Sequence, residues 1–139
     1  MLERTASGAP KLRRPLHEGF PVKDAEASLK FYTEVLGFQK KREFPAGGYK
    51  WLTVVSPEAP DDIELSLEPN ANPAAKTFQQ AMFAQGIPLA AFETGDIAGD
   101  FQRLKSLGVV FTSEPTSMGP VTIAIFSDTC GNLIQMYQK

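Results

Sequence analysis

The sequence predicts an α+β fold built from two tandem copies of a strand-helix-strand-strand-strand unit. A strand-like run that ends at Asp24 leads into a helical stretch that stops at Gly37, and the same order returns with Asp96 and Gly108. After each helix, apolar and polar residues alternate, which is typical of strands. A unit this short cannot bury its own apolar face, so we expect the two copies to share a core.

The first unit is expected to cover about residues 16–68. Asp24 caps its helix, because a carboxylate at this position can accept from the free amides of the first helical turn. Gly37 ends the helix as a residue that readily takes a positive φ. The strands of this unit are expected over residues 17–22, 38–44, 49–55 and 63–68.

The strand over residues 63–68 alternates most clearly. Ile63, Leu65 and Leu67 fall on one face of it, because side chains alternate across a strand. Glu64 therefore lies on the opposite face, away from the core.

The second unit is expected to cover about residues 87–138. Its helix begins after Asp96 and carries an apolar stripe that ends before Gly108. A linker and a short helix over residues 69–86 join the two units. The strands of the second unit are expected over residues 87–94, 109–112, 121–126 and 132–138.

Length and composition indicate one domain over residues 15–139, preceded by a flexible N-terminal arm over residues 1–14. A net charge of −2 and a pI near 5.4 give no electrostatic support for binding nucleic acid. No apolar run is long enough to span a membrane, and no secretory signal begins the sequence. The single cysteine, Cys130, excludes an internal disulfide, so we expect a cytoplasmic protein.

Two signatures carry a resemblance to a known family: Val22-x-Asp24 with Ser28-Leu29-x-Phe31-Tyr32-Thr33-x-Val35-Leu36-Gly37-Phe38, and Asp128-x-x-Gly131-Asn132-Leu133-Ile134-Gln135. Together they resemble the glyoxalase, bleomycin-resistance and extradiol dioxygenase superfamily, also called the vicinal oxygen chelate superfamily, over about residues 16–138. The resemblance implies two βαβββ modules that form an open mixed-sheet cup. It also implies a homodimer, because relatives often complete their cups with the partner chain. Members are either metal-dependent enzymes or metal-free binders, and the fold does not decide between these.

The resemblance also implies positions for metal ligands. His17, seven residues before Asp24, and Glu64 match the first two positions of metal-using relatives. Leu89 stands at the third and cannot coordinate a metal, and Gln135 at the fourth offers only a neutral amide. A catalytic divalent site generally needs three protein ligands. We therefore expect no metal and no other cofactor; a divalent metal, if bound, would use His17, Glu64 and Gln135.

Other catalytic signatures are missing. The sequence has one histidine, no glycine-framed serine and no phosphate-binding glycine loop. Cys130 lies in a turn beside no residue that would activate it as a nucleophile. Glu64 and Glu93 remain candidates for a metal-independent base if the fold removes them from water.

The cup itself is expected to have an aromatic, mildly polar lining. Leu52 and Val54 face the helices in this interpretation, so Trp51 faces the cup. In the alternative interpretation, Trp51 and Tyr137 pack between the modules or at a dimer interface. The candidate ligand-binding residues are His17, Tyr49, Trp51, Glu64, Leu89, Gln135 and Tyr137.

Two functions follow. The first is a metal-free protein that binds a small planar or amphipathic molecule in the aromatic-lined cup. The alternative is a metal-dependent lyase or isomerase of the glyoxalase type, acting on an α-oxo or thioester-like compound through His17 and Glu64.

Overall fold

The computed structural model describes residues 3–4, 10–11 and 17–139. In the N-terminal region, β1 (Glu3–Arg4) pairs antiparallel with β2 (Pro10–Lys11). The prediction of a flexible arm over residues 1–14 otherwise lies outside the described residues.

The first module forms a four-stranded sheet in the order β3-β6-β5-β4. β3 is parallel to β6, and the remaining pairs are antiparallel. The helix of this module continues as a short π-helix. The elements are β3 (His17–Val22), α1 (Ala25–Lys30), η1 (Phe31–Val35), β4 (Gln39–Ala46), β5 (Tyr49–Val55) and β6 (Glu64–Pro69).

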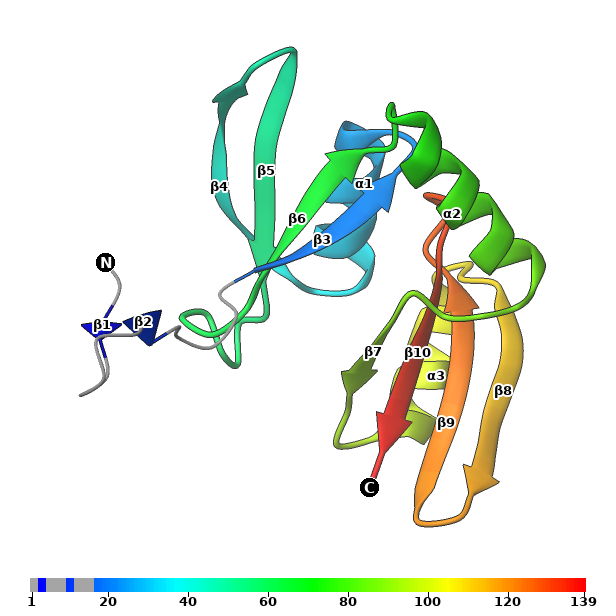
Figure 1. Ribbon diagram of the computed structural model, residues 1–139. Helices are drawn as coiled ribbons and strands as arrows, with labels where there is room; N and C mark the ends of the chain where they lie inside the picture. Colours follow the sequence, from blue (N-terminus) through cyan, green and yellow to red (C-terminus); the bar gives the residue numbers. More distant parts are fainter. Residues whose placement is uncertain (1–2, 5–9, 12–16) are drawn as a thin grey trace.

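The second module repeats this arrangement with the strand order β7-β10-β9-β8. The long helix α2 (Pro73–Ala84) joins the modules. In Figure 1, α1 and α3 lie behind the strands of their own sheets, so the front of each sheet carries no helix from its own module. The elements are β7 (Ala90–Glu93), α3 (Ile97–Ser106), β8 (Phe111–Met118), β9 (Val121–Ser127) and β10 (Leu133–Gln138).

The two helix caps confirm the predicted repeat. The Asp24 carboxylate accepts from the amide of Ala27 at 3.0 Å, and the Asp96 carboxylate accepts from the amide of Gly99 at 3.0 Å. Each helix is followed by a glycine in the left-handed region, Gly37 at φ 87° and Gly108 at φ 89°. The fold is therefore α+β with two tandem modules, as the sequence predicts.

Several element boundaries differ from the expected ones; the strand expected over residues 87–94, for example, is β7, which covers only Ala90–Glu93. α2 begins at Pro73 with Asn72 as its cap, because proline fits the first turn of a helix, where no amide is needed. β8 continues through Pro115 to Met118. An edge strand tolerates proline, since its outer amides need no partner strand. Ile63 lies outside β6 and is 41% exposed.

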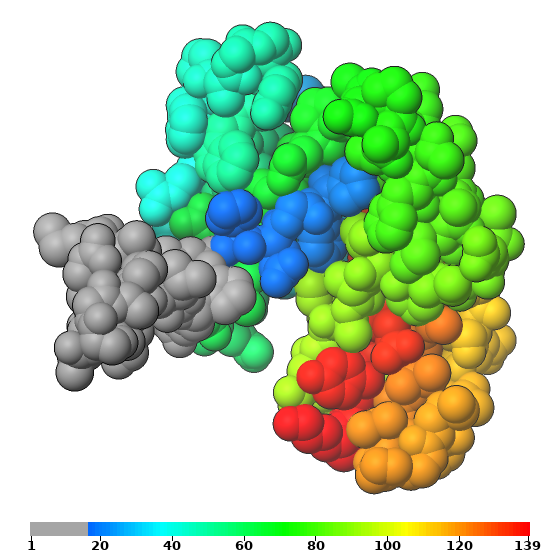
Figure 2. All heavy atoms as spheres, viewed as in Figure 1, coloured from blue at the N-terminus to red at the C-terminus, as the bar shows by residue number. Residues whose placement is uncertain are grey.

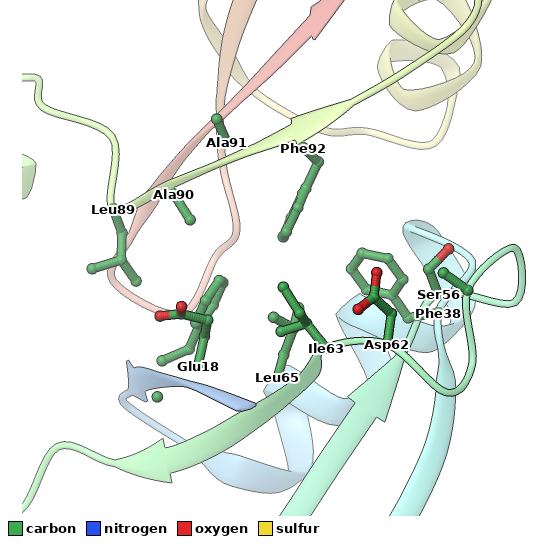
Figure 3. Close-up of a pocket in the computed structure, with 13 residues that line it drawn as sticks. Glu18, Phe38, Ser56, Asp62, Ile63, Leu65, Leu89, Ala90, Ala91 and Phe92 are labelled. Carbon is green, nitrogen blue, oxygen red and sulfur yellow. The ribbon is translucent and has the colours of Figure 1, made fainter. Parts of the chain in front are cut away.

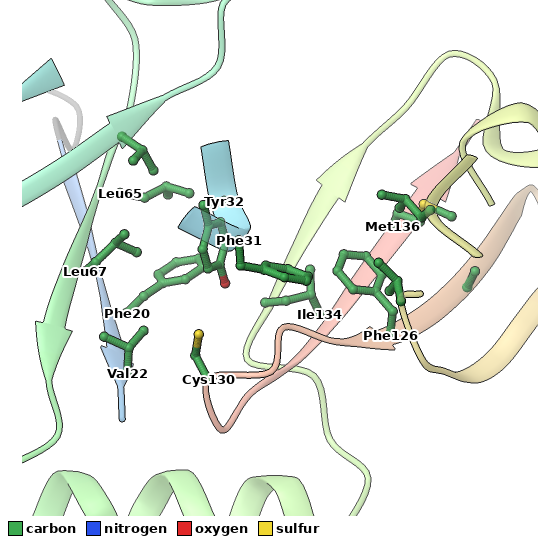
Figure 4. Packing of buried hydrophobic residues seen from close by; sticks show 14 of the residues in the cluster. Phe20, Val22, Phe31, Tyr32, Leu65, Leu67, Phe126, Cys130, Ile134 and Met136 are labelled. Carbon is green, nitrogen blue, oxygen red and sulfur yellow. The ribbon is translucent and has the colours of Figure 1, made fainter. Parts of the chain in front are cut away.

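One apolar core extends through both modules (Figure 4). The predicted alternation is confirmed on the first sheet. Phe20 stacks against Phe92 with ring centroids 6.2 Å apart, and these residues stand at equivalent positions, four before each cap. The edge strands β3 and β7 therefore meet along matching positions. The buried apolar side chains that follow this alternation on the first sheet are Phe20, Val22, Leu52, Val54, Leu65 and Leu67; Thr53, Val55 and Ser66, on the opposite face, are also buried.

A buried carboxylate in the second module accepts a hydrogen bond from the first module. Asp128 is fully buried and accepts four hydrogen bonds, one of which comes from the Tyr32 hydroxyl on η1 at 2.8 Å. The other donors are the amides of Cys130 and Asn132 and the side chain of Asn132. Burial, followed by the charge of Asp128, raises the pKa of Tyr32 well above its ordinary value, so the hydroxyl remains a donor.

The same network holds α2 in place. The Gln79 side chain donates to the carbonyls of Pro21 at 2.7 Å and Cys130 at 3.1 Å, and it accepts from Asn70 at 2.6 Å. Asn132 also donates to the Pro21 carbonyl, at 2.9 Å. Buried polar groups without partners are costly, so this network favours a single placement of α2 and the two modules.

We expect Tyr32→Phe to lower the free energy of unfolding by about 2 kcal/mol, because it removes a buried hydrogen bond to a charged group. Tyr49→Phe is the matched control, since Tyr49 is 52% exposed. Urea unfolding measures both variants. If both variants lost only a small and equal amount of unfolding free energy, the contact between Tyr32 and Asp128 would not stabilise the fold as proposed.

Candidate ligand-binding site

An aromatic array lies on the face of the first sheet that points away from its helix. The Trp51 ring meets the His17 ring edge-on at 5.6 Å and lies 6.3 Å from the Phe44 ring. Strand register places Gly19 and Ser66 in the row between His17 and Trp51, so small side chains give the indole space to reach the imidazole. His17 and Trp51, both predicted site residues, are thus brought together.

Glu64 lies beside this array, directly opposite His17 in the β3–β6 register. Its carboxylate accepts from Arg42 Nε at 3.0 Å and lies 3.7 Å from Lys41 Nζ. Partial burial raises the pKa of Glu64, but hydrogen bonding from Thr53 and Arg42 and the charges of Arg42 and Lys41 outweigh it. The pKa therefore falls below its ordinary value.

The Thr53 hydroxyl is the one buried side-chain polar atom in the described residues without a hydrogen-bond partner of regular geometry. Thr53 lies opposite Ser66 in the sheet and points to the same face as Trp51. Its orientation toward Glu64 helps to lower the pKa of that carboxyl without a fully formed bond.

A groove of about 920 Å³ continues along this face beside α2. Its floor is the backbone and small side chains of β3, and its walls are the β4–β5 hairpin and α2. Tyr49 and Leu89, both predicted site residues, line it. The lining residues are Gly19, Pro21, Gly48, Tyr49, Glu68, Pro69, Ala71, Asn72, Ala74, Ala75, Phe78 and Leu89.

Glu68 has a fixed position in this groove. The Ser66 hydroxyl donates to its carboxylate at 2.7 Å. A side chain at position 19 would meet that carboxylate at 2.5 Å, so Gly19 leaves the space that Glu68 occupies.

A second hollow of about 520 Å³ lies between the modules. Figure 2 shows the surface hollowed between the first module and the strands of the second. In Figure 3, Glu18 and Asp62 stand on either side of Ile63, and Phe92 reaches toward them from β7. Gly19, Leu65, Phe38 and Leu89 also line this cleft. Because Gly19 and Leu89 line both hollows, the groove and the cleft adjoin at these two residues.

The remaining predicted residues lie on the second sheet. Gln135 and Tyr137 are on β10, and within the described residues no hydrogen bond, ion pair, ring contact or strand pairing joins them to His17 or Trp51. The equivalent of the His17–Glu64 pair in the second module is Leu89 beside Leu133, since the Leu89 amide donates to the Leu133 carbonyl at 2.8 Å. Gln135 therefore corresponds to Ser66, not to Glu64.

These positions do not fit a catalytic metal. In the described part of the chain, no three His, Cys, Asp or Glu side chains gather closely enough to hold an ion. Glu64 is already paired with a guanidinium, which competes with any cation for its oxygens. The pair equivalent to His17 and Glu64 consists of two leucines.

Two further sequence expectations concern single residues. Burial, followed by the charge of Asp128, raises the pKa of the Cys130 thiol to about 11, so the thiol stays protonated and a poor nucleophile at neutral pH. Glu93 is half exposed and lies 3.7 Å from Lys139 Nζ, so the fold does not remove it from water, which the expectation of a metal-independent base required.

Sequence reasoning missed several residues that shape the site. Arg42 lies two strands from Glu64 in the sheet, and their pairing depends on a bulge between Lys40 and Arg42 that alternation does not reveal. Phe78 comes from α2, whose packing the sequence leaves open. Glu68 carried a usable signal, because it alternates in phase with Glu64.

The repeated sheets and the open groove define a two-module α+β protein with a surface suited to a small molecule. The chain belongs to the Glyoxalase/Bleomycin resistance protein/Dioxygenase superfamily, whose sequence model matches residues 14–136. In the described residues, no helix has both the length and the apolar character that crossing a membrane requires.

Individual proteins extend this comparison. The chain is 54% identical over 118 residues to the uncharacterized protein YurT of Bacillus subtilis (strain 168), covering 85% of this chain and 93% of that one. The crystal structure of UcmS2 matches with a TM-score of 0.80 at 27% identity, covering 91% of this chain and 98% of that chain. TnmS3, an antibiotic binding protein from Streptomyces sp. CB03234, matches with a TM-score of 0.74 at 27% identity, covering 91% and 96%.

We expect protein purified without chelator to carry far less than one zinc, nickel, manganese or iron per chain, because no third ligand joins His17 and Glu64 in the part of the chain that the structure describes. Elemental analysis by mass spectrometry measures this, with His17→Ala as the control. Metal near one equivalent that is lost in His17→Ala would contradict the expectation.

Proposed function

We propose that this protein binds a small organic molecule, without a metal, on the outward face of its first sheet. The observation that carries the proposal is the array of Trp51, His17 and Phe44 beside a groove of about 920 Å³. Concave surfaces of this size with aromatic walls and few polar groups are typical of small-molecule sites.

The chemistry of this face favours a flat or amphipathic ligand. Trp51 is only partly buried, so one part of the indole remains available for stacking. Tyr49 and Phe78 add exposed aromatic surface at the rim of the groove. The similarity to TnmS3, an antibiotic binding protein, supports a ligand of this kind.

The alternative is a metal-dependent reaction of the glyoxalase type. One observation favours it, namely that His17 and Glu64 lie opposite each other on neighbouring strands. The lowered pKa of Glu64 and its pairing with Arg42 count against it, because a carboxylate held in its charged form is a weak base. Metal-free binding therefore agrees better with the geometry.

We also propose that a second copy of the chain completes the site. The groove is open on its outer side, and three aromatic side chains around it are about half exposed: Phe44 at 49%, Tyr49 at 52% and Phe78 at 53%. Removing exposed apolar surface of this kind from water lowers the free energy. A homodimer would cover it while closing the groove over a ligand.

Binding of the neutral dye Nile red should change the fluorescence of Trp51, which is the only tryptophan. We expect Trp51→Ala to weaken Nile red binding at least several-fold, because one lost stacking contact is worth about 0.5–1.5 kcal/mol beyond its area. Phe83→Ala is the matched control, since Phe83 is exposed on α2 but lies outside this groove. Equal losses in both variants would contradict the assignment.

Glu64→Gln separates binding from catalysis in the same assay. In a binding protein it should change Nile red affinity little, because Arg42 and Lys41 already compensate the charge. Loss of turnover of an α-oxo compound in this variant, with the fold intact, would instead support the enzyme.

We expect the chain to sediment as a dimer at micromolar concentration. Replacing Tyr49 and Phe78 together by glutamate should shift it to the monomer, because charge is costly in an apolar interface. Phe83→Glu is the control. Sedimentation velocity measures all three proteins, and a monomeric parent chain would contradict the proposal.

A further inference from the structure

We propose that the ligand is an organic cation with a flat apolar body, and that its charged group binds Glu68. This inference rests on the proposed function above and adds the charge of the ligand and the residue that selects it. The groove and the cleft lie on either side of the edge strand β3, and both are lined by Gly19 and Leu89.

Among the residues that the structure describes, the charged ones that line the groove and the cleft are all acidic. They are Glu18 and Asp62 in the cleft and Glu68 in the groove, and no lysine, arginine or histidine within the described ranges lines either part. Asp62 already interacts with another group, so Glu18 and Glu68 are the main sources of negative potential. Between low-dielectric walls, charges of one sign raise the local concentration of ligands of the opposite sign. The lining therefore favours a cation over a neutral molecule and disfavours an anion.

Glu68 differs from its neighbour Glu64 in one decisive respect. Arg42 and Lys41 compensate the charge of Glu64. Glu68 is on the same face of β6, four residues after Glu64. It makes no ion pair with any residue that the structure describes, and it accepts a hydrogen bond from the neutral Ser66 hydroxyl. No cation within the described residues therefore pairs with the Glu68 carboxylate, and the hydrogen bond from Ser66 orients it.

Two small residues, Ser66 and Gly19, determine where the Glu68 side chain lies. The Ser66 hydroxyl donates a hydrogen bond to one oxygen of the Glu68 carboxylate. Because Gly19 has no side chain, that carboxylate can occupy the space next to the backbone of residue 19. Tyr49 and Phe78 line the same groove, so an ammonium or guanidinium at Glu68 would lie close to aromatic rings that also attract cations.

The cleft offers room for the apolar body. Phe38 and Phe92 meet edge to face at 5.2 Å there, and Leu65 and Ile63 complete an apolar floor (Figure 3). A ligand anchored at Glu68 can cross the edge of β3 at Gly19 and place its flat part on this surface. Glu18 lies on the side of the cleft that Ile63 and Leu65 form, and its carboxylate adds electrostatic attraction for the cation.

The experiment compares three dyes by fluorescence anisotropy: rhodamine 6G, a cation; Nile red, which is neutral; and fluorescein, an anion. The full chain should bind rhodamine 6G most tightly and fluorescein least. Glu68→Gln should weaken rhodamine 6G binding about tenfold, as expected for loss of a charge-assisted contact in a partly exposed site, and leave Nile red within twofold. Glu34→Gln is the matched control, because Glu34 lies on η1, outside both hollows.

The outcomes separate this inference from the proposed function. If no dye binds, both are overturned. If Nile red or fluorescein binds as tightly as rhodamine 6G, and Glu68→Gln changes nothing, the protein is a small-molecule binder without the charge selection. If Glu68→Gln and Glu34→Gln weaken rhodamine 6G equally, net charge accounts for the effect, and the role of Glu68 is overturned.

Discussion

The arrangement of this protein depends on the buried carboxylate of Asp128. It belongs to the turn between β9 and β10, yet it accepts a hydrogen bond from Tyr32, which lies 96 residues earlier in the first module. A buried carboxylate that loses its hydrogen-bond donors carries a large free-energy cost. The contact with Tyr32 therefore favours one relative placement of the two modules. Gln79 extends the constraint to α2 by donating to carbonyls of both modules.

The candidate site is a consequence of this constraint. Leu89 precedes β7 in the second module, but it lines the groove on the first sheet and the cleft between the modules. The wall of the groove that carries Phe78 is α2, which Gln79 holds. The surface that we propose for the ligand thus exists only while the modules and α2 keep their relative positions.

Much of the fold could be predicted because its signals are local. Asp24 and Asp96 cap helices within their own turns, and the alternation that places Leu65 and Leu67 in the core is readable along one strand. The site depends on contacts that no local pattern contains. The pairing of Arg42 with Glu64 needs a bulge and two strand registers, and the place of Gln135 on a separate sheet needs the whole arrangement of modules.

The most direct test of the account is a nuclear magnetic resonance titration of the nitrogen-15-labelled full chain with rhodamine 6G. The account predicts that the indole N–H of Trp51 and the backbone amides of Gly19 and Leu89 shift together, since the ligand lies where the groove and the cleft adjoin. Shifts confined to β10, at Gln135 and Tyr137, with Trp51 and Gly19 unchanged, would contradict it.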